Sequence, residues 1–343
     1  MHTAAFVENT LTEKSGLAAE FHRWPLPGYI WPALHGIYQS IFCSEPHLRV
    51  HGSLRSDIQA WVSRSNGGIA GVILFQVTGR VVRVINEMHV LDAGQLNKFA
   101  RALFRAYAEV DAICLHAIHI QGNGMLLPLL QAEYSEDYLL ALPDSADAWK
   151  ASLSSQTREK LRYHYRRSCR KQPDLRFRQI NGYDMSEAQF DRVLQLSRAR
   201  MSRKGRSFNM NEREAQCLRA MIRECGQLSV IEIGGEICAG LLCTRLEKSI
   251  FMHVIAHDPR HDDLRLGFLC CALTIEAAIA SRAERFHFLW GSYDYKTRLG
   301  GRRWSLYRAV VFRSWLHALA HPWLLAGQMA QRARQKIKQR RHH

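Results

Sequence analysis

The sequence predicts an α/β protein of the α+β kind, built from two copies of one β-β-β-α-β lobe in which helices flank a mixed, mainly antiparallel sheet. Its 343 residues are enough for two domains of ordinary size. The composition, 47% hydrophobic and 23% charged, is typical of folded proteins and excludes the disordered and collagen-like classes. The order of apolar runs and glycine-rich links in residues 58–118 recurs in residues 228–290, which predicts a duplicated fold.

The first copy contains three strand-like runs, a helical run and a final buried strand. In order, these runs cover residues 58–62, 69–77, 81–90, 96–110 and 112–118. Asn66-Gly67-Gly68 separates the first two runs, and Thr78-Gly79-Arg80 separates the next two. Short glycine-rich links between β-rich runs are typical of hairpins, so the three runs predict a meander. The spacing of apolar residues in the fourth run predicts a helix.

The second copy repeats this order. Its runs cover residues 228–233, 237–245, 250–257, 268–280 and 286–290, with Gly234-Gly235 as the first link. Ala70-Gly71 of the first copy corresponds to Ala239-Gly240 of the second at an offset of 169 positions. The final strands, which begin at 112 and 286, are offset by 174 positions.

Residues 144–171 predict a basic helix that links the two lobes. A narrow apolar stripe at multiples of four comprises Trp149, Leu153, Leu161, Tyr165 and Cys169. A plain bridging helix with a solvated basic face is the alternative to a binding helix. Residues 186–227 predict a second helical stretch, interrupted around Gly205 by a loop, MSRKGRSFNM, that is placed to border a site. The predicted domains are 1–145 for the first lobe, 146–175 for the linking helix, 176–313 for the second lobe and 314–343 for a basic amphipathic tail.

The net charge of +16 is concentrated in the second half of the chain. Residues 1–149 hold 10 Lys/Arg against 14 Asp/Glu, whereas residues 150–343 hold 37 against 17. Two stretches, 150–206 and 296–343, supply most of this charge. Such a field attracts polyanions, which include phosphate-rich donors, tRNA, acyl carrier protein and anionic lipid. A solvated basic surface that keeps the protein soluble is the alternative.

The nine cysteines and the ends of the chain predict a cytoplasmic protein. No CxxC pair and no zinc-finger spacing occurs, so we expect reduced, mostly buried thiols. The start, MHTAAFVENTLTEKSG, lacks the pattern of a secretory signal, and residues 314–331 contain Pro322 and two His, which makes them a poor membrane span. The basic residues after this segment predict that the tail rests on an anionic membrane surface. Packing of the apolar part on the body is the alternative.

Three segments carry a resemblance to a known family. They are AWKASLSSQTREKLRYHYRR (148–167), HDPRHDDLRLGFLCCALTIEAA (257–278) and FHFLWGSYDYKTRLG (286–300). Over about residues 145–313 the chain resembles the BioF2-like, or CelD-like, acyltransferase domain of the GCN5-related N-acetyltransferase (GNAT) superfamily, which is akin to the Fem peptidyltransferases. The Gly-x-x-x-Tyr-Lys ending is among the most specific parts of this resemblance. Where the family often has an Asp before its glycine motif, this chain has His287.

The resemblance implies where an acyl donor binds. Strand 249–258 splays from strand 286–290, so that its unpaired backbone groups can bind the pantetheine arm of acyl-CoA. The loop and helix start that follow present backbone N–H groups to the pyrophosphate. The residues that the donor would contact are Arg260, Arg265, Gly267, Phe268 and Trp290. Gly267 is the only glycine that remains of the usual acetyl-CoA loop pattern.

Four residues are catalytic candidates. His253 and His257 lie four residues, or two pleats, apart on the donor strand and hence on one face, where either can act as general base toward an amine. A structural histidine is the alternative for each, as it is for His287. We expect Lys296, with Tyr293 beside it, to anchor a phosphate or carboxylate rather than to act as nucleophile, because nothing nearby in sequence promises to lower its pKa. A surface lysine after a strand is the alternative.

Arg158, Arg162, Asp294 and Tyr295 complete the predicted site as residues that bind the acceptor substrate. Arg158 and Arg162 are four residues apart on one helical face, where they can clamp a phosphate or carboxylate. No Ser-His-Asp triad, metal-ligand cluster or P-loop is apparent, and no metal is expected. Direct attack on a thioester needs only positioning and stabilisation of the oxyanion.

These features predict an N-acyltransferase that transfers an acyl group from acyl-CoA, or from acyl carrier protein, to an amine acceptor. One alternative keeps the fold but takes aminoacyl-tRNA as the donor, as Fem-type proteins do. A second alternative is a non-catalytic accessory protein, associated with a membrane or a polysaccharide, that retains the GNAT fold. The sequence does not name the acceptor.

Overall fold

The computed structural model describes residues 11–12, 18–203, 205 and 210–340, and the chain divides into two compact units. The first unit comprises Met1–Ser135 and Ser305–His343, and the second comprises Glu136–Trp304. The boundaries between the two compact units therefore fall after residues 135 and 304, whereas the lobe boundaries predicted from the sequence lie at 145 and 313. Half of the loop expected around Gly205, residues 204 and 206–209, lies outside the described residues, and residues 201–203 belong to a helix.

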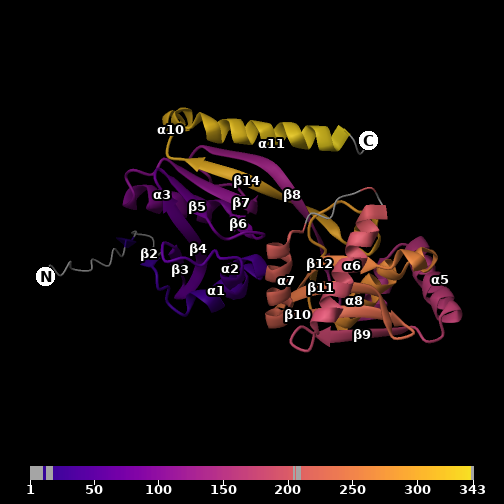
Figure 1. Ribbon diagram of the computed structural model, residues 1–343. Helices are drawn as coiled ribbons and strands as arrows, with labels where there is room; N and C mark the ends of the chain where they lie inside the picture. Colours follow the sequence, from indigo (N-terminus) through magenta and orange to yellow (C-terminus); the bar gives the residue numbers. More distant parts are fainter. Residues whose placement is uncertain (1–10, 13–17, 204, 206–209, 341–343) are drawn as a thin grey trace. The chain divides into compact units, whose positions relative to one another are not determined.

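The first unit contains a sheet with helices on both faces (Figure 1). Its strand order is β1-β2-β3-β4-β5-β7-β14, with β6 paired to β7 and β8 next to β14. The strands are β1 (Leu11–Thr12), β2 (Ala18–Arg23), β3 (Gln59–Ser65), β4 (Gly68–Thr78), β5 (Val81–Val84), β6 (Val90–Asp92), β7 (Ala112–Gln121), β8 (Leu129–Ala141) and β14 (Arg302–Phe312). The helices are α1 (Ile30–Tyr38), the short 3₁₀ helix η1 (Ile41–Cys43), α2 (Glu45–Val50), α3 (Ala93–Ala106), α10 (Trp315–Ala320) and α11 (Pro322–Arg340).

The second unit has the sheet order β8-β13-β12-β11-β10-β9. Its further strands are β9 (Arg176–Asn181), β10 (Gly226–Ile233), β11 (Glu236–Leu246), β12 (Ser249–His257) and β13 (Arg285–His287). Its helices are α4 (Ala146–Ser152), α5 (Ser155–Lys171), α6 (Glu187–Arg203), α7 (Glu212–Cys225), η2 (Pro259–Leu264), α8 (Leu266–Ala280) and α9 (Asp294–Arg298). One face of the sheet packs against α6 and α7, and the other packs against α8. Helix α8 is apolar nearly all round because α4 and α5 cover the side that the sheet does not.

The predicted repeat is confirmed by the order and direction of the strands. In the first unit β3 and β4, and then β4 and β5, pair antiparallel, while β5 pairs parallel with β7 after the crossover through α3. In the second unit β10, β11 and β12 pair in the same way, and β12 pairs parallel with β13 after α8. Both units are therefore β-β-β-α-β folds in which only the final pair is parallel.

The register of the repeat differs by one residue from the sequence prediction. The β3–β4 hairpin shifts register at Ser63/Arg64, and the β10–β11 hairpin does so at Ile231/Glu232. When these two bulges are aligned, Gly71 of the first copy corresponds to Ala239 of the second, at an offset of 168 positions. The sequence comparison matches Ala70 with Ala239 instead. A shared Ala-Gly pair is a weaker marker of register than a bulge, because the bulge determines which face every later side chain takes.

Three predicted elements differ in length from the observed ones. The run 81–90 stops at Val84, because the side-chain Oδ1 of Asn86 accepts a hydrogen bond from the Leu74 backbone N–H at 2.6 Å in place of a backbone carbonyl. The linking helix is two helices, since Ser154 caps α5 by accepting from the Thr157 N–H at 3.3 Å. The strand 286–290 ends at His287, where Leu289 has a left-handed φ of 55°.

The sequence predicts reduced, mostly buried cysteines, and the structure shows how each of them is placed. None of the nine cysteines forms a disulfide with another described residue, and Cys43, Cys238, Cys243, Cys270 and Cys271 are buried. Burial raises the pKa of the Cys243 thiol to about 12, so this group stays protonated at neutral pH.

In the described part of the chain, no helix combines the length and the apolar composition needed to cross a bilayer.

Candidate active site in the second unit

The central feature of the second unit is a splay between two parallel strands. β12 pairs with β13 over three residues, from Ser249 opposite Arg285 to Phe251 opposite His287. β12 then continues to His257, and no described strand pairs with residues 252–257 on this side. The predicted splay is therefore present, and it leaves backbone donors and acceptors of β12 available to an amide-bearing ligand.

A bulge on β12 lies directly beyond this splay. Met252 is opposite Cys243 and Val254 is opposite Leu242, so His253 is an extra residue in the strand. Met252 packs in the cluster with α8, whereas Val254 packs in the cluster with α6 and α7. After the bulge, the side chains of β12 alternate between the two faces of the sheet in the opposite order. The equivalent strand of the first unit, β5, ends before the corresponding position.

The expectation that His253 and His257 share one face is wrong because of this bulge. The Nε2 atom of His253 lies 2.8 Å from the hydroxyl of Thr244, on the side of α6 and α7. His257 lies on the opposite side, at the start of α8, where its Nε2 is 3.0 Å from the Asp262 carboxylate. A Cβ on Gly267 would come within 2.8 Å of the His257 Nδ1, so only glycine fits there without displacement.

The two arginines predicted to bind phosphate have different surroundings. Arg260 already contacts two carboxylates, at 2.7 Å from Asp258 and 3.2 Å from Glu236. Arg265 is exposed, immediately precedes α8 and has a left-handed φ of 55°. Its guanidinium makes no hydrogen bond or ion pair with the described residues. Burial, followed by the charge of Arg265 and then of other cations on α5, lowers the pKa of His164, so the start of α8 and α5 form one positive region.

The two aromatic donor candidates differ in burial. Phe268 is in the first turn of α8 and packs against the buried cluster of the second unit. Trp290 follows β13 and is 52% exposed. An exposed indole at the end of the splay offers a flat apolar surface to a ligand.

Lys296 is the largest departure from the sequence prediction. Its side chain is only 1% exposed, and its Nζ donates hydrogen bonds to the carbonyl oxygens of Leu289, at 2.8 Å, and Trp290, at 2.7 Å. The ammonium also lies 5.3 Å from the ring centre of Tyr138 and 5.7 Å from that of Tyr293. The surface-lysine alternative is therefore wrong. Lys296 holds the loop after β13, and its proposed contact with a substrate anion stays a prediction.

Burial also overturns the expected protonation behaviour of Lys296. It lowers the pKa of the ammonium to about 8, although the carboxylates of Asp137 and Glu136 act in the opposite direction. The sequence around Lys296 carries no apolar run that would reveal this burial. The enclosing groups come instead from β8 and from the loop after β13.

The remaining residues of α9 and its cap divide between core and surface. Tyr293 and Tyr295 stack with ring centres 6.1 Å apart, and burial raises the pKa of the Tyr295 phenol. Gly291 has a φ of 93° and approaches the Tyr293 ring so closely that a Cβ would lie within 2.8 Å of it. Asp294 is exposed, with Arg298 at 3.8 Å.

Sequence reasoning missed the carboxylate partner of His287. Asp137 on β8 is fully buried, and its Oδ2 lies 2.6 Å from the Nδ1 of His287. The His287 ring stacks on Phe251 at 4.4 Å with an angle of 14° between the planes. The substitution of His for the family's usual Asp was visible in the sequence. Its partner was not, because β8 was not predicted and Asp137 is 150 residues away.

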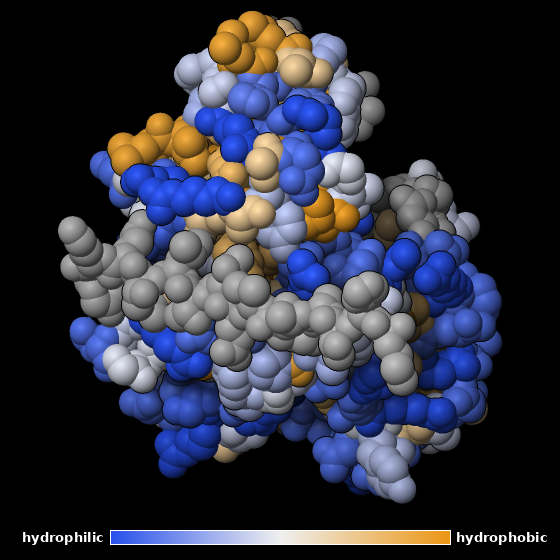
Figure 2. Space-filling model, turned by 90° about the vertical axis from the view of Figure 1, so that its left-hand side faces the viewer, coloured by the Kyte–Doolittle hydropathy of each residue, from blue (hydrophilic) through white to orange (hydrophobic). Residues whose placement is uncertain are grey.

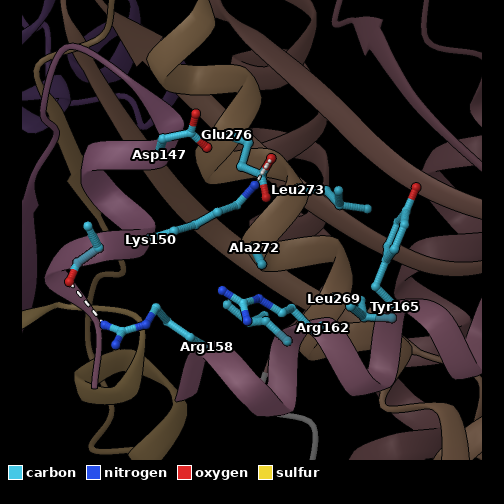
Figure 3. A pocket seen from close by; sticks show the side chains of 11 residues that line it. Asp147, Lys150, Arg158, Arg162, Tyr165, Leu269, Ala272, Leu273 and Glu276 are labelled. Atoms are coloured by element: carbon cyan, nitrogen blue, oxygen red, sulfur yellow. Dashed lines mark hydrogen bonds and ion pairs between the residues drawn. The ribbon is translucent and has the colours of Figure 1, made fainter. Parts of the chain in front are cut away.

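The other predicted cations line a pocket between α4, α5 and α8. Figure 3 shows Arg158 and Arg162 rising from α5, with Lys150 and Glu276 across the opening. The pocket has a volume of about 770 Å³ and an apolar floor that includes Leu269, Ala272 and Leu273. Arg158 Nη1 donates to the carbonyl oxygens of Ala151, at 3.1 Å, and Leu153, at 2.5 Å.

The predicted two-arginine clamp is therefore not free to close on a ligand. Arg158 holds the turn between α4 and α5, and Lys150 is paired with Glu276 at 2.8 Å. Arg162 is exposed at the rim of the same pocket. The structure thus brings Arg158 and Arg162 to one pocket but leaves only Arg162 without a structural contact among the described residues.

Comparison with known proteins finds one matching family and several solved structures of similar fold. Residues 155–297 match the acetyltransferase (GNAT) domain family. The crystal structure of FemX has a TM-score of 0.62 with this chain at 9% identity, and the match covers 88% of this chain and 99% of FemX. The structure of L-PGS from Bacillus licheniformis, with 11% identity, has a TM-score of 0.47 and covers 84% of this chain and 92% of that one. No curated protein sequence matches significantly.

The family match confirms the resemblance found in the sequence, and the similarity to FemX confirms the fold class. Residues 155–297 are thus similar to the acetyltransferase (GNAT) domain family, within a chain whose fold is similar to that of FemX.

Proposed function

We propose that the protein is an N-acyltransferase that takes an acyl group from acyl-CoA, or from acyl carrier protein, and transfers it to an amine. The single observation that carries this proposal is the splay of β12 from β13 with a bulge at His253, in a domain of the GNAT family. Residues 252–257 of β12, with which no described strand pairs on this side, offer amide-binding groups to a pantetheine arm. A donor that binds along this edge has its thioester at the point where β12 and β13 part.

The same geometry supports a site for the donor phosphates. Arg265 lies at the beginning of a 15-residue helix, and α5 adds further positive charge around His164. A pyrophosphate fits a helix start with a free guanidinium, because backbone N–H groups and cation act together. Arg260 is held by Asp258 and Glu236, so its proposed role is to shape η2 and its contribution to phosphate binding is the smaller one.

The test is a donor survey. Thermal shift and mass spectrometry of co-purified ligand are applied to the full chain with acetyl-CoA, long-chain acyl-CoAs, acyl carrier protein and charged tRNA. Saturable stabilisation by an acyl-CoA or by acyl carrier protein, followed by thiol release when a primary amine is added, is the expected result. Stabilisation by none of the thioesters would contradict the proposal.

An aminoacyl-tRNA-dependent transferase is the second candidate, and the basic second half favours it. Residues 150–343 carry 37 Lys/Arg against 17 Asp/Glu, and Arg162, Tyr163 and Arg166 are exposed on α5. The fold similarity to FemX is compatible with this candidate but says nothing of the donor. An affinity for charged tRNA that falls steeply with salt, together with no response to acyl-CoA, would favour it.

A membrane-bound role is compatible with either donor, and the C-terminal helices favour it. Trp315, Leu316, Leu319 and Trp323 are between 60% and 78% exposed on α10 and at the start of α11. Figure 2 shows hydrophobic side chains gathered at the top of the molecule, where α10 lies. The sequence that follows is rich in Lys and Arg. Two exposed indoles next to a basic segment match the composition of a helix that lies in an anionic lipid interface.

Part of this tail packs on the first unit. Ala318 and Leu324 join a buried cluster with β7 and β14, and the Gln331 side chain donates to the Glu133 carbonyl oxygen at 3.0 Å. This packing leaves one side of the helices for the body of the unit and the other for a lipid surface. An accessory protein without catalysis would bind anionic vesicles through these helices and show no donor binding in the survey above.

A further inference from the structure

We propose that His287, oriented by Asp137, is the general base that accepts the proton of the attacking amine. This inference rests on the proposed acyl transfer and adds a catalytic residue to it. It is carried by a buried His–carboxylate pair at the exact residue where β12 and β13 part.

The position of His287 is determined by the strands around it. Phe286 and Phe288 pack in the cluster with α8, so the His287 side chain between them projects to the opposite face, toward α6 and α7. Phe251 lies between Ile250 and Met252, which also pack toward α8, and its ring stacks on His287 from the same opposite face. His287 is therefore at the vertex of the splay, on the side opposite to α8.

The hydrogen bonding of the pair leaves one nitrogen available. His287 Nδ1 donates to the Asp137 carboxylate, so the neutral ring has its lone pair on Nε2. This Nε2 is buried and has no hydrogen-bond partner among the described residues, and the same is true of Asp137 Oδ1. The His287 residue is 7% exposed and Asp137 is 0% exposed. Buried polar atoms are nearly always partnered, so an orphaned imidazole nitrogen at this point indicates a ligand group that completes the site.

Other charged groups nearby do not compete for this role. The Lys296 ammonium lies beside Tyr138, which packs in the α8 cluster, and it is held by two carbonyl oxygens. Its charge also acts on the Asp137 carboxylate, but its hydrogen bonds are directed at the loop after β13 and not at His287. His253 projects to the same face as His287 but is bonded to the Thr244 hydroxyl. His287 is the imidazole that combines a carboxylate partner with an unpartnered nitrogen at the splay.

In the proposed transfer, His287 Nε2 takes up one proton and later returns it. The neutral amine nitrogen attacks the thioester carbonyl carbon, a C–N bond forms, and the carbonyl oxygen becomes an oxyanion. The attacking nitrogen then carries one proton too many, and His287 Nε2 accepts it while Asp137 stabilises the imidazolium. Collapse of the intermediate breaks the C–S bond, and the imidazolium returns the proton to the leaving thiolate. The products are an amide and a thiol, and the imidazole is again neutral.

The experiment uses the full chain with an acyl-CoA and a primary amine that the wild type accepts, and measures free CoA. The variants are His287→Gln, His287→Ala and Asp137→Asn. His321→Gln is the matched control, because His321 is a buried histidine whose Nε2 lies 2.9 Å from Asp111 in the first unit. Donor Kd and the unfolding midpoint are measured for every variant.

We expect His287→Gln to lower kcat by roughly 10²- to 10⁴-fold, the range of general acid–base catalysis, with donor Kd unchanged. Asp137→Asn should lower kcat with little change in KM, since the amide selects the wrong tautomer of the ring. Imidazole added to His287→Ala should restore part of the rate, which a merely structural role of His287 would not allow. His321→Gln should retain wild-type kcat.

Two results would overturn the inference without affecting the proposed function. One is transfer by His287→Gln within threefold of the His321→Gln control. The other is a loss of kcat that follows a loss of donor binding or of folded protein, with no rescue of His287→Ala by imidazole. A wild type that transfers from none of the acyl-CoAs to any amine would instead contradict the proposed function, and the role of His287 would fall with it.

Discussion

The ammonium of Lys296 holds the carbonyl oxygen of Leu289 at 2.8 Å, and Leu289 has a left-handed φ of 55°. A non-glycine residue in this conformation is uncommon and needs support from its surroundings. Lys296 supplies that support from α9, together with a second hydrogen bond to the Trp290 carbonyl oxygen. The shape of the loop at the end of the splay therefore depends on a residue that contacts it only through backbone atoms.

Lys296→Met should change the pH dependence of stability. The pKa is lowered from 10.5 to about 8 in the folded protein, so the unfolded state binds more protons between pH 8 and 10.5. The free energy of unfolding of the wild type should gain at most about 3 kcal/mol from this group as the pH rises through that interval. Denaturant unfolding at pH 7.5 and 10 checks this. An identical pH slope in Lys296→Met and wild type would contradict the assignment.

Lys296→Arg should be as impaired in transfer as Lys296→Met. A cation at position 296 would be enough if the residue only attracted a substrate anion from solvent. The side chain is 1% exposed between two tyrosines, so a longer, planar guanidinium costs about 1–3 kcal/mol in this site. Steady-state transfer rates at saturating donor are the measurement. An Arg variant near wild-type activity would show that charge matters and the loop contact does not.

Arg265→Ala should weaken donor binding by about three- to tenfold, because an exposed guanidinium contributes one screened, charge-assisted contact to a phosphate. Titration calorimetry with an acyl-CoA at two salt concentrations measures the change, which should shrink as salt increases. Arg178→Ala is the control, since Arg178 is an exposed arginine on β9 paired with Glu232. Equal effects of both substitutions would mean that only the general field of the unit attracts the donor.

Gly267→Ala should destabilise the second unit by about 1–3 kcal/mol and reduce donor affinity. Its Cβ would meet the His257 Nδ1 at 2.8 Å, and either the ring or the start of α8 must move. Gly36→Ala in α1 is the matched control, because a Cβ there meets no atom within 4 Å. That control should be more stable than wild type by about 0.5–1 kcal/mol, as alanine favours a helix. Thermal unfolding of both variants distinguishes a local clash from a general effect of the substitution.

Binding to anionic vesicles should depend on the exposed indoles of the C-terminal helices. Trp315→Ala combined with Trp323→Ala should reduce partitioning onto phosphatidylglycerol vesicles roughly tenfold, because interfacial aromatic area is lost. Tyr183→Ala, which removes an aromatic ring that is 88% exposed in the second unit, is the control. Sedimentation with anionic and with neutral vesicles measures both the apolar and the electrostatic parts. Unchanged binding of the double variant would mean that the helices do not contact lipid.

The repeated meander and the crossover helices could be predicted from sequence patterns alone, and the family resemblance implied the position of the splay. Strand alternation, glycine-rich links and helical spacing are local patterns, each contained within about ten residues. They therefore do not depend on which other segments pack against them. The resemblance at Gly291, Tyr295 and Lys296 likewise pointed to the correct end of β13.

Which groups meet at the site depends on contacts between segments that lie far apart in the sequence. The bulge at His253 depends on pairing with β11, and it separates His253 from His257, which strand periodicity placed together. The burial of Lys296 and the pairing of His287 with Asp137 depend on β8, which joins the sheet from far along the chain. Burial and hydrogen-bond partners are properties of neighbours in space, and those neighbours are chosen by chain closure over long distances, so the chemistry of these residues follows from the fold and not from their sequence surroundings.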